Sequence, residues 1–250
     1  MLTPERHQMI LGMLKEKDVV RIHEIVEATG VSESTIRRDL SELEELHLLK
    51  RIHGGAASIQ SKIEEQTFIE KAVKHETEKM AIGKFAASLV NEGDSVFIDG
   101  GTTTFHMLAH LPENILVVTN GVDIALQLVI RQIKTILLGG ELKAGTLSLV
   151  GCEAIRNLSQ FRFDKCFLGS NGIDTVHGIT TPDPEEAYIK QLACQSSDET
   201  YVLCDSNKFS RVTFAKIIDL DHVKLITDDR LDDEEQKVYR QLTKLVVVRT

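Results

Sequence analysis

The sequence predicts an α/β protein with a small N-terminal winged helix-turn-helix domain and a larger α/β domain built on a mostly parallel sheet. Residues 1–57 show three helical patterns followed by a short basic hairpin pattern, which is typical of a winged helix-turn-helix. Residues 76–250 alternate short β-branched runs with amphipathic helical patterns, which is typical of a parallel sheet covered on both faces. The polar, charged residues 58–75 between these parts are expected to form a linker.

The first two helices are predicted from their end signals and their apolar spacing. In "TPERHQMILGMLKEK", Thr3 can cap a helix whose first position is Pro4, and apolar residues then recur at helical spacing. In "DVVRIHEIVEATG", apolar residues share one helical face. Gly30 is expected to close this helix, because glycine adopts a positive φ at little cost.

The stretch "VSESTIRRDLSELEEL" predicts a helix that would read DNA. Ser32 can cap it, and a connection of about four residues that contains glycine separates it from the preceding helix. Its apolar stripe consists of Ile36, Leu40 and Leu43. Its opposite side carries Ser34, Arg38 and Ser41, and Thr35 and Arg37 flank that side. Such side chains hydrogen-bond base edges and phosphates. The alternative is that the two arginines are merely a solvated pair.

The segment "LHLLKRIHGGAAS" predicts a hairpin wing beside that helix. Two leucines give way to basic residues and then to a glycine pair that suits a tight turn. The predicted DNA-contacting residues are Ser32, Ser34, Thr35, Arg37, Arg38, Ser41, Lys50, Arg51, His53 and Gly54.

Composition narrows the classes of function. The formal net charge is −9, and residues 1–60 hold 8 Lys and Arg against 10 Asp and Glu, so any DNA contact must come from local clustering. No apolar run approaches the roughly 20 residues of a membrane span. The amino terminus shows no targeting pattern, and we therefore expect a cytoplasmic protein. The cysteines at 152, 166, 194 and 204 form no C-x-x-C pair and are expected to be buried free thiols.

Strands and helices are expected to alternate through the second domain. The predicted strands are "SVFID", "ILVVT", "KTILLG", "DKCFLG", "TYVLC", "KLIT" and "LVVV". The predicted helices are "EKMAIGKFAASLV", "TTFHMLAHL", "VDIALQLVI", "GCEAIRNLSQ", "PEEAYIKQLACQS" and "DDEEQKVYRQL". Ligands of such sheets bind beyond the carboxyl ends of the strands, so polar residues there are candidates for a binding site.

The stretch "FIDGGTTTFH" holds one such strand end. A strand ends at Asp99, Gly100 and Gly101 allow close backbone approach, and Thr102–Thr104 begin a helix. Free N–H groups, threonine hydroxyls and the helix dipole would together hold a phosphate. The stretch is neither a P-loop nor a G-x-G-x-x-G fingerprint. An ordinary strand-to-helix turn capped by threonine is the alternative.

Other strand ends add hydroxyls, amides, carboxylates and lysines, which suit a polyol phosphate. They comprise Thr119, Asn120, Gly139, Gly140, Ser170, Asn171, Gly172, Asp174, Thr180, Thr181, Glu185, Glu186, Lys190, Asp205 and Lys208. Glu186 and Lys190 also fit an ordinary i, i+4 ion pair behind a helix cap at Asp183. His106 and His110 lie four apart, but a third ligand and a general-base glutamate are missing, so we interpret them as core or half-buried residues rather than metal ligands.

The stretch "GVSESTIRRDLSELEELHLLKRIHGGA" closely resembles the N-terminal domain of the DeoR family of bacterial transcriptional regulators. The spacing from "TIRRDL" to "HGGA" carries most of this resemblance. His47 departs from the glycine that is usual in the family, so a slightly altered turn is expected. The second domain resembles the family's effector domain, which is related in fold to ribose-5-phosphate isomerase.

This resemblance implies that the loop Asp99–Thr104 holds the phosphate of a sugar phosphate and that other strand ends line its sugar. With the strand ends above, the expected effector-binding residues are Asp99, Gly100, Gly101, Thr102, Thr103, Thr104, Thr119, Asn120, Gly140, Asn171, Gly172, Thr181, Glu186, Lys190 and Lys208. The stretch "TTPDPEEAYIK" looks most like members that govern hexose use. It suggests a hexose phosphate such as fructose 1-phosphate or tagatose 6-phosphate.

We therefore expect a transcriptional repressor of a carbohydrate uptake or catabolism operon, without enzyme activity, cofactor or metal. Operators usually mirror protein symmetry, so a homodimer or homotetramer is expected. The alternative is a sugar-phosphate isomerase with an appended DNA-binding domain, in which Asp99, Asp174 or Glu186 would be the general base. Against it, "SNGID" lacks the acid-rich loop of the isomerase. A DNA-binding module without a ligand would leave the polar strand ends unexplained.

Overall fold

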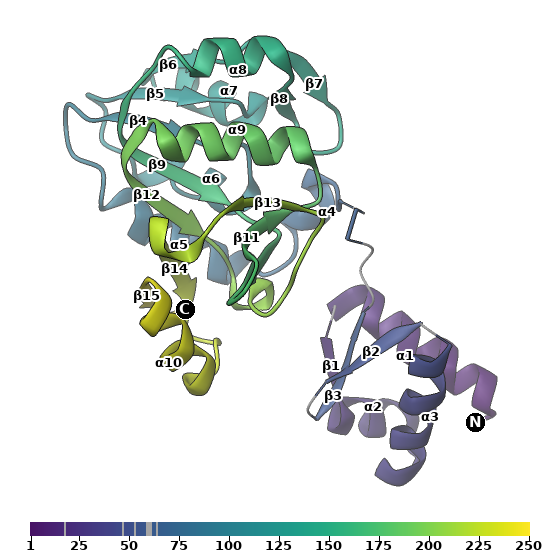
Figure 1. Cartoon of the computed structure of the whole chain (residues 1–250). Coiled ribbons are helices and arrows are strands. Elements are labelled where there is room, and N and C mark those ends of the chain that lie inside the picture. Colours follow the sequence, from purple (N-terminus) through teal and green to yellow (C-terminus); the bar gives the residue numbers. More distant parts are fainter. Residues whose placement is uncertain (18, 47, 53, 59–61, 64) are drawn as a thin grey trace. The chain divides into compact units, whose positions relative to one another are not determined.

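The computed structural model divides the chain into two compact units, Met1–Ser61 and Lys62–Thr250. Figure 1 shows both units, and the structure describes residues 1–17, 19–46, 48–52, 54–58, 62–63 and 65–250. The sequence predicts a linker over 58–75, but its residues from 62 onward belong to the second unit. The reason is that Phe68–Ala72 form helix α4, and the Phe68 N–H donates to the Gly145 carbonyl at 2.7 Å.

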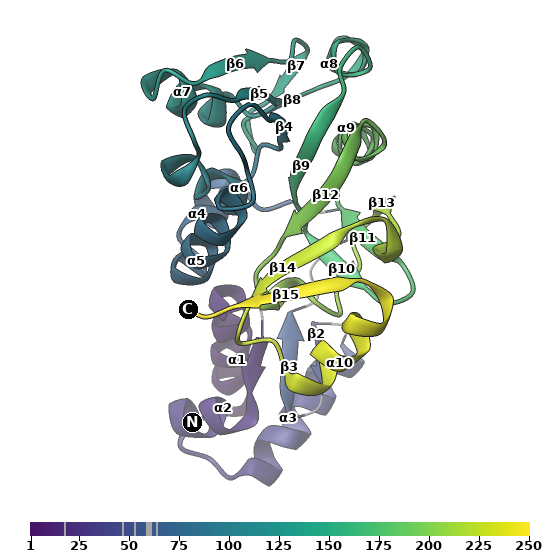
Figure 2. The same ribbon diagram turned by 90° about the vertical axis from the view of Figure 1, so that its left-hand side faces the viewer.

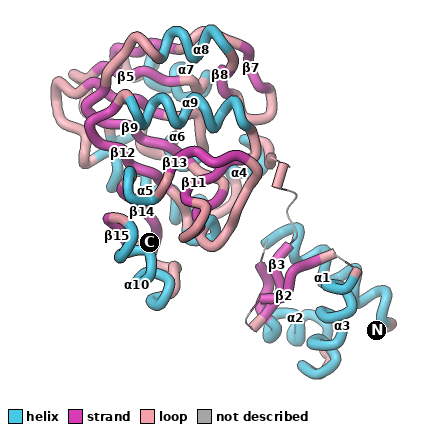
Figure 3. Tube along the Cα trace, in the orientation of Figure 1, coloured by secondary structure: helices cyan, strands magenta, loops and turns pink. Residues whose placement is uncertain are grey.

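Within the described residues of the first unit, three helices accompany a three-stranded antiparallel sheet (Figure 3). Its elements are α1 (Thr3–Lys17), β1 (Val19–Arg21), α2 (Ile22–Thr29), α3 (Glu33–Glu45), β2 (Leu49–Ile52) and β3 (Gly55–Ser58). The strand order is β1-β3-β2, and aliphatic side chains of the helices and strands share one buried core. The sequence predicts helix over Val19–Arg21, but these residues pair with β3 instead. β-Branched valines suit such a half-buried strand, and tertiary pairing outweighs the local pattern.

The turn between α2 and α3 has the predicted end signals. Gly30 adopts a φ of 70°, and its N–H donates to the Val26 carbonyl at 2.8 Å, so α2 ends there. The Ser32 hydroxyl accepts the Thr35 N–H and caps α3. Both end signals are confirmed, and together they set the residue at which α3 begins.

A buried ion pair joins α1 to α3. The Arg6 guanidinium donates to both carboxylate oxygens of Asp39, at 2.5 and 2.7 Å, and both side chains are almost fully buried. Burial alone would raise the pKa of Asp39, but the hydrogen bonds and the charge of Arg6 outweigh it and hold this pKa below its ordinary value. Asp39 of the "TIRRDL" stretch therefore anchors α3 and leaves the neighbouring arginines on the outer face.

The second unit is built on a seven-stranded, all-parallel sheet in the order β15-β14-β12-β9-β4-β5-β6. Its strands are β4 (Ser95–Ile98), β5 (Leu116–Thr119), β6 (Lys134–Leu137), β9 (Phe163–Gly169), β12 (Ser197–Leu203), β14 (Lys224–Asp228) and β15 (Lys244–Val248). These are the seven strands that the sequence predicts, and the parallel α/β architecture is confirmed.

Helices cover both faces of this sheet (Figure 2). The helices are α5 (Glu76–Ala87), α6 (Thr102–Phe105), α7 (Val122–Ile130), α8 (Cys152–Leu158), α9 (Pro184–Gln195) and α10 (Asp233–Leu242). α5 and α7 share a core with Val96 and Ile98 of β4, whereas α8, α9 and α10 share a core with Phe97 on the opposite face. The helix expected over residues 103–111 is shorter, since α6 ends at Phe105 and a separate 3-10 turn, η1, follows at Leu108–His110.

Two small sheets lie outside the predicted pattern. They contain β7 (Glu141–Lys143) with β8 (Ser148–Val150), and β10 (Gly172–Asp174), β11 (Gly178–Thr181) and β13 (Ala215–Ile218). Strands β7, β8 and β10 are three residues long, too short to show a period in the sequence. Further 3-10 turns are η2 (Ser206–Lys208) and η3 (Leu220–His222).

The cysteines are free thiols, and three of them are buried as predicted. Cys152 is exposed, so its expected burial is wrong, because it occupies the first turn of α8 on the surface. Among the residues that the structure describes, no helix is long and apolar enough to span a bilayer.

Replacing Asp39 by asparagine tests the ion pair. Asp39→Asn leaves the buried Arg6 without a charged partner, so we expect amide hydrogen exchange in peptides covering 33–45 to quicken about tenfold or more at pH 7. The pKa of Asp39 is lowered in the folded chain. The stability that its ionised carboxylate contributes is therefore complete above the ordinary pKa of 3.8, and it is lost as the pH falls through the pKa of Asp39 in the folded chain. The difference between variant and unsubstituted chain should therefore shrink in acid.

Glu33→Gln is the matched control, because it removes only the exposed partner of Arg37 and should leave exchange nearly unchanged. Equal protection of 33–45 in Asp39→Asn and in the unsubstituted chain would contradict the anchoring role.

Candidate functional site

The outer face of α3 is the candidate DNA-reading surface. Ser34, Arg37 and Arg38 are exposed there, and Ser32 hydrogen-bonds both Ser34 and Thr35 through their hydroxyls. Arg37 forms an exposed ion pair with Glu33 at 2.5 Å. Within the described residues, Arg38 makes no hydrogen bond or ion pair, so its guanidinium is available to a ligand.

The wing is attached to this helix by polar contacts. Arg51 of β2 donates from its guanidinium to Ser41 at 2.8 Å and from its N–H to Glu44 at 2.7 Å. Lys50 is exposed, and Gly54 lies at the hairpin tip with a φ of 79°. Arg51 thus joins the wing to Ser41 of α3, whereas the Gly54 carbonyl accepts the Ile22 N–H at 2.9 Å. His53, predicted to contact DNA, and His47, predicted to alter the turn, lie outside the described residues.

The second candidate site is the carboxyl edge of the seven-stranded sheet. Because the strands are parallel, the residues that follow β4, β5, β9, β12 and β14 all lie at this edge. Most of the polar side chains predicted for the effector lie here and are buried. The buried ones are Asp99, Thr102, Thr103, Thr104, Thr119, Asn120, Thr181, Glu186 and Lys190.

Asp99 and Lys190 form a buried ion pair at the centre of this edge. The Lys190 ammonium of α9 donates to Asp99 Oδ2, and the same oxygen accepts the Gly169 N–H at 3.1 Å. Burial raises the pKa of Asp99. Burial acts to lower the pKa of Lys190, but the charges of Asp99 and Glu186 outweigh this effect. The pKa of Lys190 is therefore raised, and its ammonium stays charged.

The loop Asp99–Thr104, which joins β4 to α6, is the candidate anion cradle. The Thr104 hydroxyl donates to the carbonyls of Asp99 and Gly101, at 2.7 and 2.8 Å, and closes the turn into α6. The N–H groups of the first turn of a helix have no acceptor inside the helix, so they face outward. A Cβ at Gly100 would lie 2.5 Å from the Ser148 hydroxyl, so only glycine fits there.

Asn120 holds this loop through its side chain. It accepts the Gly100 N–H at 3.0 Å and donates to the Leu149 carbonyl at 3.4 Å. The Thr119 hydroxyl accepts the Gly121 N–H at 3.0 Å and so orders the turn after β5. Asn120 therefore positions the backbone of the candidate phosphate site, and Thr119 positions the neighbouring turn.

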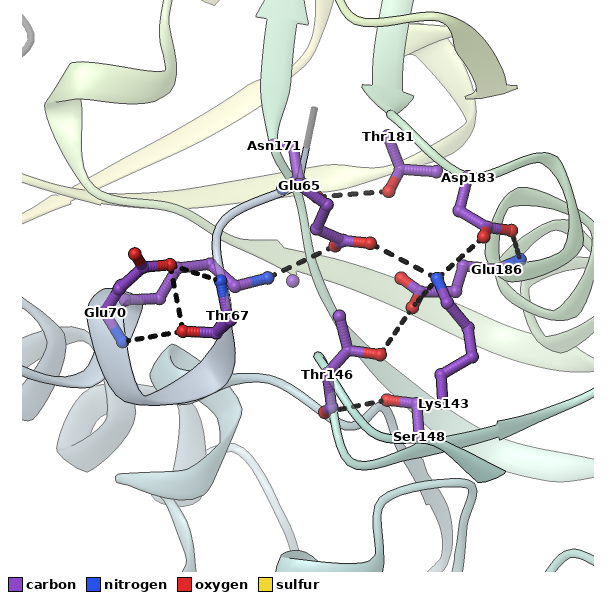
Figure 4. Close-up of polar contacts among 12 residues, drawn as sticks. Glu65, Thr67, Glu70, Lys143, Thr146, Ser148, Asn171, Thr181, Asp183 and Glu186 are labelled. Carbon is purple, nitrogen blue, oxygen red and sulfur yellow. Dashed lines mark hydrogen bonds and ion pairs between the residues drawn. The ribbon is translucent and has the colours of Figure 1, made fainter. Parts of the chain in front are cut away.

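Glu186 belongs to a charged cluster that the sequence does not reveal (Figure 4). Its Oε1 accepts from the Lys143 ammonium and from the Thr146 hydroxyl, each at 2.8 Å. Lys143 also pairs with Asp183 at 2.7 Å and with Glu65 at 3.3 Å. Burial would raise the pKa of Glu186, but Lys190 and Lys143 lower it overall, so the carboxylate stays ionised.

Asp183 has two functions in this cluster. It caps α9 by accepting the Glu185 and Glu186 N–H groups, as the sequence predicts, with Pro184 at the first helical position. It also binds Lys143, which raises the pKa of that lysine together with Glu186. A sequence pattern can reveal that Asp183 caps a helix, but it cannot reveal that Asp183 also pairs with Lys143.

The strand ends after β9 and β11 complete this part of the site. The Thr181 hydroxyl donates to the Asn171 side chain at 3.1 Å (Figure 4). The Ser170 hydroxyl is buried and has no partner among the described residues. A Cβ at Gly172 would lie 2.6 Å from the Arg211 carbonyl, and one at Gly140 2.3 Å from the Val150 carbonyl. These two glycines permit close backbone packing.

A third group lies where Lys208 follows β12. Asp205 is buried and caps η2. Burial would raise the pKa of Asp205, but the charge of Lys208 outweighs it and the pKa of Asp205 is lowered. Lys79 of α5, which the sequence does not single out, lies nearby. Burial lowers the pKa of Lys79 to about 8, and the charges of Lys208 and Lys71 act in the same direction. His75 contacts Asn207 at 3.3 Å.

The histidine pair follows Thr102–Thr104, with His106 at the C-cap of α6 and His110 in η1. His106 is half-buried as expected, but His110 is exposed, and both line a pocket of about 520 Å³ with Lys84 and Arg131. Burial lowers the pKa of His106.

Comparisons with known proteins identify both units. Residues 6–62 match the DeoR-like helix-turn-helix domain, and residues 74–230 match the DeoR C terminal sensor domain. The uncharacterized HTH-type transcriptional regulator FruR of Bacillus subtilis is 43% identical over 98% of this chain and all of its own length. The lactose phosphotransferase system repressor of Staphylococcus epidermidis is 33% identical over 97% of this chain and 98% of its own.

Solved structures add a distant likeness of fold. Ribose 5-phosphate isomerase A from Methanocaldococcus jannaschii is 14% identical, with a TM-score of 0.42 over 54% of this chain and 55% of that chain, and this carries no functional argument. The relatives that match along nearly the whole chain are transcriptional regulators, not enzymes. With its helix-turn-helix unit and its sensor domain, the chain belongs to the DeoR family of transcriptional regulators.

Proposed function

We propose that this regulator represses a carbohydrate uptake or catabolism operon and that a phosphorylated sugar, bound at the carboxyl edge of the second unit, sets its operator affinity. The observation that carries the proposal is the buried polar edge itself. Asp99, Glu186 and Lys190 are each nearly fully buried there. Charged groups are placed in such a position only with partners, and polar edges of parallel sheets are where such folds bind ligands.

The proposed ligand has two chemically different ends. The first turn of α6 and the loop Asp99–Thr104 would hold the phosphate through N–H groups and threonine hydroxyls. The carboxylates, amide and hydroxyls of the Glu186 and Asn171 groups would bind sugar hydroxyls, which both donate and accept hydrogen bonds. Lys208, which lies in η2 after β12, would add a positive charge opposite the phosphate.

The finer points of this proposal concern the sugar, the assembly and the compartment. A hexose phosphate such as fructose 1-phosphate or tagatose 6-phosphate is the proposed effector. Support comes from the relative named a lactose phosphotransferase system repressor. A homodimer or homotetramer in the cytoplasm would present paired recognition helices to two operator half-sites.

DNA recognition is proposed to occur through α3 and the wing. Arg38 would contact base edges, since its guanidinium is exposed and without a partner among the described residues. Arg37 must exchange its Glu33 partner for phosphate, and Lys50 would add a second phosphate contact. The isomerase alternative loses its support, because the full-length relatives are regulators.

Arg38→Ala tests the reading surface. Loss of a bidentate base contact is expected to weaken operator binding at least about tenfold for each half-site, while sugar-phosphate binding is retained. Fluorescence anisotropy with DNA from upstream of the protein's own gene cluster, at a fixed salt concentration, measures the affinity.

Arg156→Ala is the matched control, because it removes one exposed arginine from α8 of the second unit and should leave operator affinity unchanged. Operator binding by Arg38→Ala as tight as by the unsubstituted chain would remove Arg38 from the reading surface.

Lys208→Ala tests the effector site. In the unsubstituted chain, one member of a panel of fructose 1-phosphate, fructose 6-phosphate, fructose 1,6-bisphosphate, tagatose 6-phosphate and ribose 5-phosphate should shift operator affinity. In the variant, the concentration needed for half of that shift should rise about tenfold or more, because a charge-assisted hydrogen bond is lost. Operator affinity without the sugar phosphate should stay the same.

The control is Lys216→Ala, which removes an exposed lysine paired with Asp219 and should respond as the unsubstituted chain does. If no member of the panel shifts operator affinity in the unsubstituted chain, the proposed class of effector is wrong.

A further inference from the structure

The residues that follow the DNA-binding unit in sequence contact the candidate effector site at several points. We call residues 65–75 the connector; it contains α4, whose N-cap Thr67 and third residue Glu70 form a capping box. The Phe68 N–H donates to the Gly145 carbonyl at 2.7 Å, and the Phe68 ring meets the edge of Phe105 in α6, with centroids 6.3 Å apart. The connector thus touches both the turn after β7 and the helix of the candidate phosphate loop.

The far end of the connector is attached to the Lys208 side of the same edge. The Lys79 ammonium donates to the Lys71 carbonyl, and the His75 ring contacts the Asn207 amide at 3.3 Å. Asn207 lies in η2, next to Lys208. The connector is therefore fastened to the turn after β7, to α6, to α5 and to η2, and two of these, α6 and η2, follow strands of the main sheet at its carboxyl edge.

Glu65 is the charged contact between the connector and the sugar end of the site. Its carboxylate lies between two ammonium groups, those of Lys71 and Lys143, each at 3.3 Å, and its side chain is 14% exposed (Figure 4). Lys143 holds Asp183 and Glu186 more closely, at 2.7 and 2.8 Å. Of the three carboxylates around Lys143, that of Glu65 has the longest contact and is the easiest to exchange for another oxygen.

A pocket of about 370 Å³ opens beside this contact. It is lined by Ile63, Glu65, Lys143, Gly145, Thr146, Pro182, Asp183, Pro184 and Phe214. Its polar lining consists of hydrogen-bond acceptors and the Lys143 ammonium. Its apolar lining includes Phe214 and two prolines. That combination suits a sugar, whose hydroxyls donate to carboxylates and whose C–H face packs on apolar groups. The surplus of carboxylates over lysine disfavours a second phosphate here.

We infer that the connector forms one wall of the effector site, in which Glu65 and Lys143 bind the hydroxyls of the sugar phosphate. We also infer that the effect of sugar-phosphate binding is transmitted to the DNA-binding unit through Glu65. This inference rests on the proposed function and assigns effector-binding roles to two residues outside the predicted set. A hydroxyl that enters between Lys143 and Glu65 replaces their direct ion pair. The ligand thereby changes the attachment of the segment that leads to the helix-turn-helix, which is the differential contact that coupling between two sites requires.

Glu65→Gln in the full chain tests the inference, because it removes the charge and keeps the size. Calorimetry would measure binding of fructose 1-phosphate, fructose 6-phosphate and tagatose 6-phosphate, with inorganic phosphate as a probe of the phosphate loop alone. We expect the sugar phosphate that binds the unsubstituted chain to bind the variant about tenfold or more weakly. Affinity for inorganic phosphate should be unchanged, which also shows that the second unit is folded.

The second measurement is the coupling between ligand and DNA. The factor by which the sugar phosphate changes operator affinity, measured by anisotropy at saturating ligand, should fall toward one in Glu65→Gln. Glu70→Gln is the matched control. It removes a carboxylate of the same connector that accepts hydrogen bonds from the N–H and the hydroxyl of Thr67, and glutamine preserves the capping box. It should leave both the affinity and the coupling factor unchanged.

The outcomes separate the inference from the proposal beneath it. If Glu65→Gln binds the sugar phosphate and transmits its effect as the unsubstituted chain does, the inference is wrong and the proposed function stands. If no sugar phosphate acts on the unsubstituted chain, the proposed function fails and the inference fails with it.

Discussion

A buried lysine between two carboxylates holds the carboxyl edge of the second unit together. Lys190 reaches from α9 to Asp99 at the end of β4, while the charge of Glu186 acts on it from one turn away on the same helix. Separating any of these charges from the others would leave an ion inside the protein without a partner, which is strongly unfavourable. The helix, the strand end and the Gly169 backbone are therefore confined to one arrangement, and the loop that follows Asp99 inherits its position from them.

The same logic applies to the first unit. Asp39 lies in the stretch that carries the candidate DNA-reading arginines, but its partner is Arg6 of α1. In both units, then, a carboxylate within a functional-looking motif supports the backbone. In the first unit the neighbouring Arg37 and Arg38 are exposed, whereas in the second unit the neighbouring threonines 102–104 are themselves buried. Polar residues of a motif divide between these two tasks, and the partner across the fold decides which task each one has.

The sequence predicts those elements of the fold that show a hydrophobic pattern or a helix-capping residue. The seven strands of the main sheet are apolar and β-branched, and Gly30, Ser32 and Asp183 end or begin helices where they were expected. The short strands β1, β7 and β10 show no such period, because three residues pair only when another strand is already in place. The Lys143 cluster was missed for a related reason. Its members come from positions 65, 143, 146, 183 and 186, and only the folded sheet edge brings them together.

The pairing of Arg37 with Glu33 has a consequence for the way this regulator searches DNA. With one arginine neutralised on its own helix and an acidic balance in the surrounding residues, few cations remain to displace counterions from the double helix. Attachment to arbitrary DNA is then expected to be weak unless Arg37 exchanges Glu33 for a phosphate. The protein would spend little of its time on other DNA, and its occupancy of a target would depend chiefly on base contacts.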